Sequence, residues 1–318
     1  MRSTNAADPP TGVVARLRGF VSHLGFEALA FVARVVPLEV ALELGAGGGT
    51  VTWLLWWNRR RLAEINVRRS LPGLSSWQVR GLVHGTFRHA GRNLFEFLRF
   101  PLMGEVELRR RVRVEGGEYM AAARRRGRGV LGLSAHLGLF ELLPATANTL
   151  DLLSCALVGR PIANPVLDHK VLELRESLGT QTLPSKGSIR QILRHLKRGE
   201  GVGMVLDQHL SPRRGGMPVE FFGRPAFTMT AVAFLQRRTG AAVLPFFMVR
   251  EGRSGRHRFI VTPPLDYERP FEDDERNDLH NTQRYTGVIE DMVRRWPDQW
   301  FWFHHRWRRA SDYEGARG

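Results

Sequence analysis

The stretch from Gly129 to Pro144, GVLGLSAHLGLFELLP, most constrains the fold of this chain. A short apolar run leads into a small turn at Ser134 and Ala135, and apolar residues at helical spacing follow. This order predicts a buried strand, a turn and a helix. In α/β folds, sites form at the carboxyl ends of strands, because the loops there open over the sheet. His136 lies at this point of the predicted structure.

Glu141 follows His136 by five residues, in or near the first turn of the predicted helix. A histidine in front of a helix can fold back over that turn, so we expect a hydrogen bond between the two side chains. The bond would hold one imidazole tautomer and raise the basicity of the free nitrogen, as a general base requires. The alternative is a capping or buried histidine beside a solvated glutamate.

From residue 112 onward, strand and helix patterns alternate. Apolar runs predict strands at 112–115, 130–133, 152–158, 202–206, 242–249 and 257–262. Helical spacing predicts helices at 118–126, 168–178, 189–197, 230–238 and 276–295. Such alternation is typical of an α/β fold with a mostly parallel sheet flanked by helices.

Three of the predicted strands end in polar residues, namely His136, Arg160 and Asp207. If these strands are neighbours, the three side chains meet at one edge of the sheet. An arginine there could bind a phosphate group with two parallel hydrogen bonds. A carboxylate there could orient the histidine. Taken singly, Arg160 could also be a surface charge and Asp207 a loop cap.

The connection after Asp207 is long, and it is both basic and aromatic. Arg213 and Arg214 precede two glycines, and we expect a mobile basic loop there. The segment FFGRPAF at 221–227 is expected to add aromatic surface. Long loops in compact domains are often functional, so this one could clamp an anionic amphiphile.

The N-terminal region is apolar from residue 20 to residue 57. Charged residues interrupt it at intervals shorter than the ~20 residues that a spanning helix requires. We therefore expect amphipathic helices on a membrane surface, ending in a cluster of tryptophans and arginines at 53–61. A helical pair packed on the domain is the alternative. The chain thus divides into a membrane-associating region at 1–58 and an α/β domain at 59–318.

The run LELGAGGGT at 42–50 resembles the glycine-rich first motif of methyltransferases that use S-adenosylmethionine. No second strand ending in an acidic residue follows at about 20 residues' distance, as a nucleotide-binding unit would require. Glycines between two apolar helices are the alternative interpretation.

Charge and cysteine content limit the partners and the compartment. The 47 Lys and Arg residues against 31 Asp and Glu residues give a net charge of +16, which favours anionic partners. Nucleic acid, acidic lipid headgroups and an acidic carrier protein all fit. The single cysteine, Cys155, excludes an internal disulfide and fits a reducing compartment.

The C-terminal run WPDQWFWFHHRW at 296–307 mixes tryptophans with basic residues. The aromatics could stack on nucleic-acid bases, lie at a membrane interface, or pack against the edge of the sheet. His304 and His305 have no cysteine or carboxylate partners at metal-binding spacing, so we expect no metal site.

Seven segments together resemble one family, the bacterial lipid A biosynthesis acyltransferases (lauroyl and myristoyl transferases), within the lysophospholipid-acyltransferase-like superfamily. They also resemble the relatives that acylate mannosylated phosphatidylinositol. The segments run in family order from about residue 59 to residue 308: NRRRLAEIN, SAHLGLFE, VGRPIANPVLD, GVGMVLDQ, FFGRPAFT, TGAAVLPFFMVR and WPDQWFWFHHRW. The most specific are HLGLFE, which matches the family's HX4E motif, and the region from DQ to FFGRPA.

The resemblance implies a glycerolipid-acyltransferase-like fold and direct acyl transfer. His136 corresponds to the catalytic base, Glu141 to the acidic member of its motif, and Asp207 to a carboxylate near the histidine. Matching segments supply the residues implied to bind substrate: Arg160, Asn164, Gln208 and Arg224.

The resemblance also implies partners and a location. The donor is expected to be an acyl thioester of acyl carrier protein or coenzyme A, with no cofactor. The acceptor is expected to be a glycolipid, foremost a lipid A precursor, and nucleic acid is not expected. The cytoplasmic face of an anionic inner membrane is the expected location. The family often has a clear membrane-spanning helix, whereas here charges and glycines interrupt the apolar N-terminus.

Three other functions fit parts of the chain. The segment Gly132 to His136 approximates the G-x-S-x-G nucleophile elbow, so a serine hydrolase using Ser134 is the main alternative. The methyltransferase and a basic nucleic-acid-binding protein are the others, the latter supported by net charge alone. Acyl chain length and the identity of the acceptor do not follow from these motifs.

Overall fold

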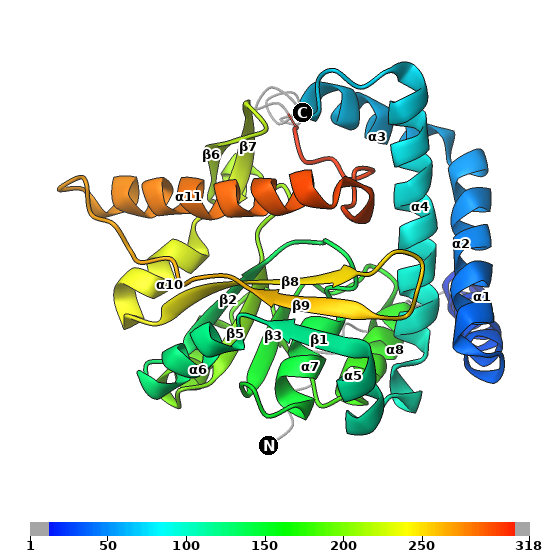
Figure 1. The fold of residues 1–318 in the computed structure, drawn as a ribbon, viewed down its shortest axis with the longest axis horizontal. Coiled ribbons are helices and arrows are strands. Elements are labelled where there is room, and N and C mark those ends of the chain that lie inside the picture. The colour runs from blue at the N-terminus through cyan, green and yellow to red at the C-terminus, as the bar shows by residue number, and fades with distance from the viewer. Residues whose placement is uncertain (1–12, 309–318) are drawn as a thin grey trace.

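The structure, a computed structural model, describes residues 13–308 around a seven-stranded sheet with the strand order β1-β9-β8-β2-β5-β3-β4 (Figure 1). The strands are β1 Val112–Glu115, β2 Val130–Ser134, β3 Cys155–Gly159, β4 Gln181–Pro184, β5 Gly201–Val205, β8 Ala242–Arg250 and β9 His257–Val261. Neighbouring strands pair in parallel, except that β8 and β9 pair antiparallel. The predicted α/β fold with a mostly parallel sheet is confirmed.

Helices cover both faces of this sheet, because alternate side chains of the central strands enter two hydrophobic cores. From β2, Leu131 and Leu133 enter one core and Val130 enters the other. The first core includes side chains of α9 (Ile189–Lys197), α10 (Ala231–Thr239) and α11 (Asp274–Arg295). The second includes side chains of α5 (Glu105–Arg111), α6 (Gly117–Arg125), α7 (Leu142–Thr149) and α8 (Pro165–Glu176). Figure 1 shows α11 above the sheet and α7 below it.

Of the four N-terminal helices, α2 and α4 pack together upright at one side of the sheet, and α3 crosses at the top (Figure 1). The four are α1 Val13–Val35, α2 Leu38–Leu55, α3 Trp57–Ser70 and α4 Ser76–Leu98. Ser75 caps α4 in a reciprocal arrangement with Gln78.

The glycine-rich run at 45–49 lies inside α2, where it brings the backbones of α2 and α4 together. A Cβ atom on Gly49 would lie 2.2 Å from the carbonyl oxygen of Phe87, and one on Gly91 would lie 2.0 Å from that of Gly45. Only glycine fits such close approach. The methyltransferase interpretation is therefore wrong, and so is the placement of these glycines between two helices.

Many large apolar side chains are exposed on α1 and α2. No helix among residues 13–308 is long and apolar enough to cross a membrane. The exposed apolar residues of these two helices are Phe20, Val21, Leu24, Phe31, Val32, Val35, Val40, Leu44, Val51, Leu54 and Leu55. The membrane association and the domain boundary after residue 58, which falls within α3, stay predictions. Residues 1–12 of the predicted N-terminal region and residues 309–318 of the predicted α/β domain lie outside the described residues.

The connection after β5 is a β-hairpin, not the mobile loop that we expected. After a short 3₁₀ helix, η2 (Pro212–Arg214), strands β6 (Gly216–Phe221) and β7 (Arg224–Met229) pair antiparallel. Phe221 and Phe222 are buried, so the expected aromatic surface is absent at these two residues. The hairpin stands beside α11 at the top of Figure 1.

The tryptophans at 300 and 302 are buried between the sheet and the hairpin region. Trp300 and Trp302 are 1% and 0% exposed, and their rings meet edge to face. Trp300 also contacts Phe221 of β6. For these two residues, packing against the sheet edge is the right interpretation, and base stacking or a membrane interface is not.

Candidate active site

Contacts with three other segments of the chain fix the turn that follows β2. Gly138 has a φ of +58°, and a Cβ atom there would lie 1.8 Å from the carbonyl oxygen of Met248. Its amide donates to the carbonyl of Gln299, and its carbonyl accepts a 2.7 Å bond from Asn93. Leu137 forms a β-bridge with Trp300. The turn therefore needs a glycine two residues after His136 and holds that histidine in place.

Asp207 binds His136 through both of its carboxylate oxygens. Strands β2 and β5 are neighbours, so the residues after their carboxyl ends meet. The Oδ1 atom of Asp207 lies 2.8 Å from Nδ1 of His136, and Oδ2 accepts a 2.8 Å bond from the His136 backbone amide. The indole of Trp300 donates to Oδ2 at 2.7 Å. The predicted meeting of His136 and Asp207 at one sheet edge is confirmed.

The electrostatics of this pair follow from burial and charge together. Burial disfavours the charged form of His136, but the neighbouring Asp207 carboxylate outweighs it, so the pKa of His136 is raised above its ordinary value. Burial also opposes ionisation of Asp207, yet the imidazole and the N–H donors lower the pKa of Asp207 to about 2. The carboxylate is therefore ionised at neutral pH and fixes the imidazole.

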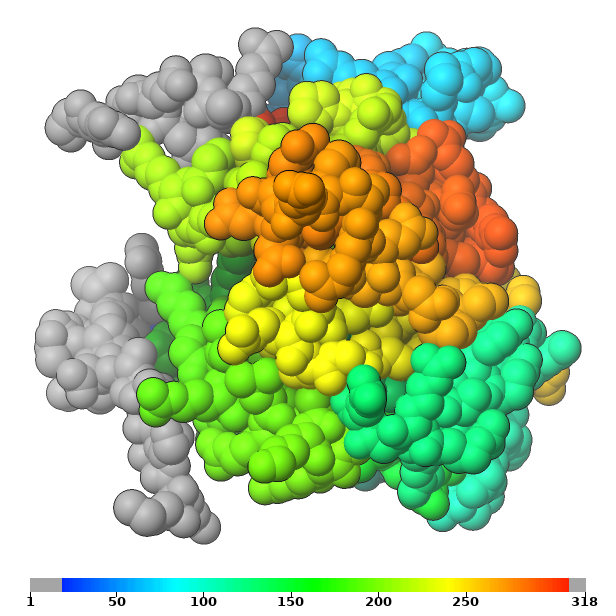
Figure 2. Space-filling model, turned by 90° about the vertical axis from the view of Figure 1, so that its left-hand side faces the viewer, coloured from blue at the N-terminus to red at the C-terminus, as the bar shows by residue number. Residues whose placement is uncertain are grey.

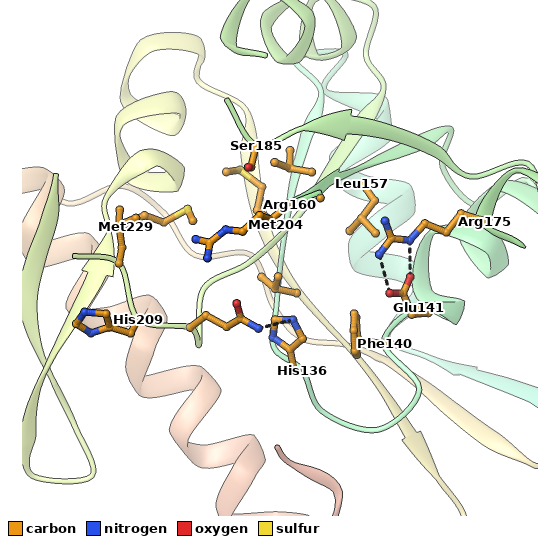
Figure 3. A pocket seen from close by; sticks show the side chains of 15 residues that line it. His136, Phe140, Glu141, Leu157, Arg160, Arg175, Ser185, Met204, His209 and Met229 are labelled. Atoms are coloured by element: carbon orange, nitrogen blue, oxygen red, sulfur yellow. Dashed lines mark hydrogen bonds and ion pairs between the residues drawn. The ribbon is translucent and has the colours of Figure 1, made fainter. Parts of the chain in front are cut away.

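In the neutral imidazole, the carboxylate at Nδ1 requires the proton on that nitrogen, which leaves a lone pair on Nε2. The amide nitrogen of Gln208 lies 3.0 Å from Nε2 and donates to it (Figure 3). Nε2 faces a cavity of about 300 Å³ that His136, Gln208 and Arg160 line together. A ligand that approaches Nε2 from the cavity would have to replace the Gln208 amide.

Glu141 does not bind His136, so the hydrogen bond that we expected between them is wrong. Both Glu141 oxygens accept from Arg175 of α8, at 2.8 and 2.7 Å, in a bidentate ion pair (Figure 3). Phe140 stands between the two groups, with its ring edge to face with the imidazole. Glu141 and Arg175 line the same cavity as His136. The catalytic role that the family resemblance implies for Glu141 stays a prediction.

The other predicted binding residues fall in three different places. Arg160 lies at the end of β3, next to β5, and points into the cavity (Figure 3). Asn164 caps α8 through its Oδ1 atom and donates to Ser22, so it holds α8 against α1. Arg224 lies at the far end of the hairpin, with its guanidinium 4.3 Å from the ring centre of Trp307. Neither Asn164 nor Arg224 lines the cavity.

The cavity has an apolar part as well as a polar one. Phe140, Leu157, Met204 and Met229 line it, and the first three also line a smaller, almost wholly apolar cavity of about 20 Å³. In Figure 2 the surface is hollowed between the yellow-green hairpin segment and the green segment below it.

Ser134, the nucleophile of the hydrolase alternative, is 5% exposed and faces the small apolar cavity. Its hydroxyl forms no hydrogen bond with any residue in 13–308, so it is not paired with His136. A serine nucleophile needs that pairing for activation. Across the same described residues, no group of three or more His, Cys, Asp or Glu side chains could hold a metal ion.

Sequence reasoning missed Trp300 and Arg175, the partners of the two acidic residues. Trp300 belongs to a segment of the family resemblance, which was a weak indication that it lies near the site. Its bond to Asp207 could not be predicted, because the two residues are 93 positions apart in the sequence. Arg175 carried none, since it is one of several charges on an amphipathic helix.

The known proteins that this chain resembles are acyltransferases. The family described as bacterial lipid A biosynthesis acyltransferase matches residues 14–309. The lipid A biosynthesis lauroyltransferase of Escherichia coli (strain K12) is 25% identical over 292 residues, 92% of each chain. The palmitoleoyltransferase of the same strain is 24% identical over 274 residues, 86% of each chain. A phosphatidylinositol mannoside acyltransferase of Mycobacterium tuberculosis is 32% identical over 191 residues, 55% of this chain and 56% of the relative.

Proposed function

The chain belongs to the bacterial lipid A biosynthesis acyltransferase family and is an acyltransferase; from this premise we propose that it moves a fatty acyl chain from a thioester to a hydroxyl of a glycolipid. A lipid A precursor is the proposed acceptor, because most of the chain aligns with enzymes of lipid A biosynthesis. The phosphatidylinositol mannoside acyltransferase supports the broader class of glycolipid acceptors. Acyl carrier protein or coenzyme A is the proposed carrier of the donor acyl group.

The observation that carries the mechanism is the bond between Asp207 and Nδ1 of His136 at 2.8 Å. This bond keeps the lone pair of Nε2 directed at the cavity. The acceptor hydroxyl replaces the Gln208 amide and gives its proton to Nε2 as its oxygen attacks the thioester carbonyl. Asp207 stabilises the imidazolium that forms. When the tetrahedral intermediate collapses, the carbon–sulfur bond breaks and the imidazolium returns the proton to the departing thiolate.

Other residues that line the cavity have supporting parts in this proposal. Arg160 would bind a substrate phosphate from the cavity wall, as the guanidinium geometry allows. The Glu141–Arg175 pair would hold the start of α7 against α8 at the cavity wall. Phe140 and Leu157 would contact the start of the acyl chain.

Rates of two variants separate direct transfer from a serine hydrolase mechanism. We expect His136→Ala to lose the general-base contribution, ~10²–10⁴-fold in kcat. Ser134→Ala is expected to keep most activity, because its hydroxyl has no partner among the described residues. Intact-mass measurement after incubation with acyl thioester should show no adduct. A stable acyl group on Ser134, together with a folded but inactive Ser134→Ala, would rule out direct transfer.

The acceptor can be identified in cells. We expect mass spectrometry of extracted lipids to show that deletion of the gene removes one acyl chain from a glycolipid, and that the His136→Ala variant does not restore it. The mass difference gives the chain length. An unchanged glycolipid profile would contradict the proposed acceptor class.

A further inference from the structure

A buried asparagine of α4, Asn93, bonds to the turn that follows His136. Asn93 is 6% exposed, and its amide nitrogen donates to the carbonyl of Gly138, 45 positions away in the sequence, at 2.7 Å. Its amide oxygen accepts from Nη2 of Arg250 at 2.8 Å. Because a guanidinium only donates and a peptide carbonyl only accepts, these two partners fix which way the amide points. A side chain that could only donate, or only accept, could not serve both.

Arg250, the last residue of β8, is itself fixed in a buried ion pair. Its Nη2 atom lies 2.6 Å from Oε2 of Glu96, and both side chains are 0% exposed. Arg111 and the imidazole of His257 bind the other oxygen of Glu96. Burial lowers the pKa of Arg250 to about 9, so the guanidinium still carries its charge at pH 7. The group that orients Asn93 is therefore a charged side chain with a fixed partner.

The amide of Gly138 leads to the same arginine by a second route. It donates to the backbone carbonyl of Gln299 at 3.0 Å. The side chain of Gln299 bonds to both the backbone amide and the carbonyl of Arg250, each at 2.9 Å. Both peptide groups of Gly138 are thus connected to one buried residue of β8. Since Gly138 follows His136 by two residues, a displacement of this turn would also displace the imidazole.

A buried polar cluster of this kind stabilises a fold poorly compared with apolar packing. Charged groups lose their hydration on burial, and well-packed apolar residues in place of a buried ion pair often give equal or greater stability. Such a cluster does specify one geometry, because each buried polar group that loses its partner is costly. Asn93 and Glu96 lie three residues apart on α4, and both bind Arg250. The geometry that they specify is that of the turn after His136.

We infer that Asn93 is a positioning residue, which holds the turn after β2 so that the Nε2 atom of His136 has the geometry that proton transfer requires. The inference rests on the proposed function, in which Nε2 takes the proton of the acceptor hydroxyl. Asp207 fixes the imidazole ring, whereas Asn93 fixes the backbone that carries the ring. A misplacement of about 1 Å can lower a rate by ~10²-fold, so both constraints matter to the reaction.

The test compares two buried asparagines that bind the backbone in a similar way. Asn281 of α11 is 0% exposed, donates to the carbonyl of Glu268 at 2.8 Å and accepts from the amide of Glu268 at 3.0 Å. Neither Asn281 nor Glu268 lines the catalytic cavity. Asn93→Ala and Asn281→Ala each remove a buried amide, so both should lower Tm. If Asn93→Ala does not fold, Asn93→Ser replaces it, because its hydroxyl can keep one of the two bonds.

The first measurement, by NMR, does not depend on activity. The Nδ1 proton that His136 donates to Asp207 should give a low-field signal, which is assigned by its loss in His136→Ala. We expect Asn93→Ala to shift or broaden this signal, because the backbone that carries the ring is no longer held. Asn281→Ala should leave the signal unchanged. The same signal in the unaltered protein and in both asparagine variants would overturn the inference, whether or not the proposed function holds.

The second measurement is the kinetics of acyl transfer. We expect Asn93→Ala to lower kcat by about tenfold or more and to keep KM within about twofold, because Asn93 does not line the cavity. Asn281→Ala should keep both constants within about twofold of the unaltered protein. An equal fall of kcat in the two variants would indicate general destabilisation and overturn the inference. Absence of acyl transfer by the unaltered protein would instead refute the proposed function, and the NMR signal would still show whether Asn93 holds the ring.

Discussion

At the scale of single residues, the pH dependence of the reaction should report the His136–Asp207 pair. The raised pKa of His136 keeps the imidazole protonated to higher pH than an ordinary histidine, whose pKa is about 6.5. Because the neutral form is the base in the proposed mechanism, activity should rise with pH through a value above that figure. A kcat profile that is already flat well below it would contradict the assignment of His136 as the base.

Asp207→Asn should move this profile and lower the rate together. Removing the carboxylate charge takes away the influence that raises the pKa, so the rising limb should shift to lower pH. The rate at the plateau should fall by ~10²-fold or more, because the imidazole loses its fixed tautomer. Rates measured from pH 5 to 9 separate the two effects. Trp300→Phe is a milder comparison, since it removes one donor to Asp207 and leaves the charge.

The central residues of the site could be predicted because strand ends in a parallel sheet meet at one edge. His136, Asp207 and Arg160 follow β2, β5 and β3, which are neighbours. The error concerned Glu141. Five residues after His136, it points toward α8, where Arg175 takes both of its oxygens. Glu141 binds Arg175, which is 34 residues away, instead of the nearby His136. The sequence around Glu141 gives no indication of so distant a partner.

At the scale of elements, the strong periodic segments were predictable and the short or unusual ones were not. β4 buries a single residue, Leu183, so it has no alternating pattern to detect. The β6–β7 hairpin turns at Phe222 and Gly223, with φ of 54° and 67°. Tight hairpin turns favour asparagine or aspartate before glycine. Because phenylalanine stands at that position here, the sequence did not predict the turn.

The close contact between α2 and α4 gives a matched pair of glycine variants. Gly49→Ala would place its Cβ 2.2 Å from the Phe87 carbonyl oxygen, so the helices must separate, at about 1–3 kcal/mol of lost stability. Gly48 has no atom within 4 Å of an added Cβ. Gly48→Ala should stabilise by up to ~1 kcal/mol through helix propensity. Denaturant unfolding measures both, and equal effects would mean that the contact is not required.

At the scale of the whole molecule, exposed apolar side chains and arginines gather along α1, α2 and the start of α3. The outer faces of α1 and α2 expose large apolar side chains, including Leu24 at 59% and Phe31 at 67%. Trp56 and Trp57 follow at the start of α3, each with an arginine over its ring. The net charge predicted an anionic partner but not which surface binds that partner, because the fold determines which arginines form ion pairs with acidic residues.

We expect this apolar face to bind anionic membranes, since its side chains can enter the lipid interface while the arginines attract headgroups. Leu24→Ser with Phe31→Ser should reduce co-sedimentation with vesicles of phosphatidylglycerol. The control is Ile189→Ser with Leu193→Ser, an exposed apolar pair one turn apart on α9. High salt should release the unaltered protein only partly, because salt screens headgroup attraction but not apolar burial. If both double variants sediment equally with the vesicles, α1 is not the docking face, and attachment must come from the arginines or from another part of the chain.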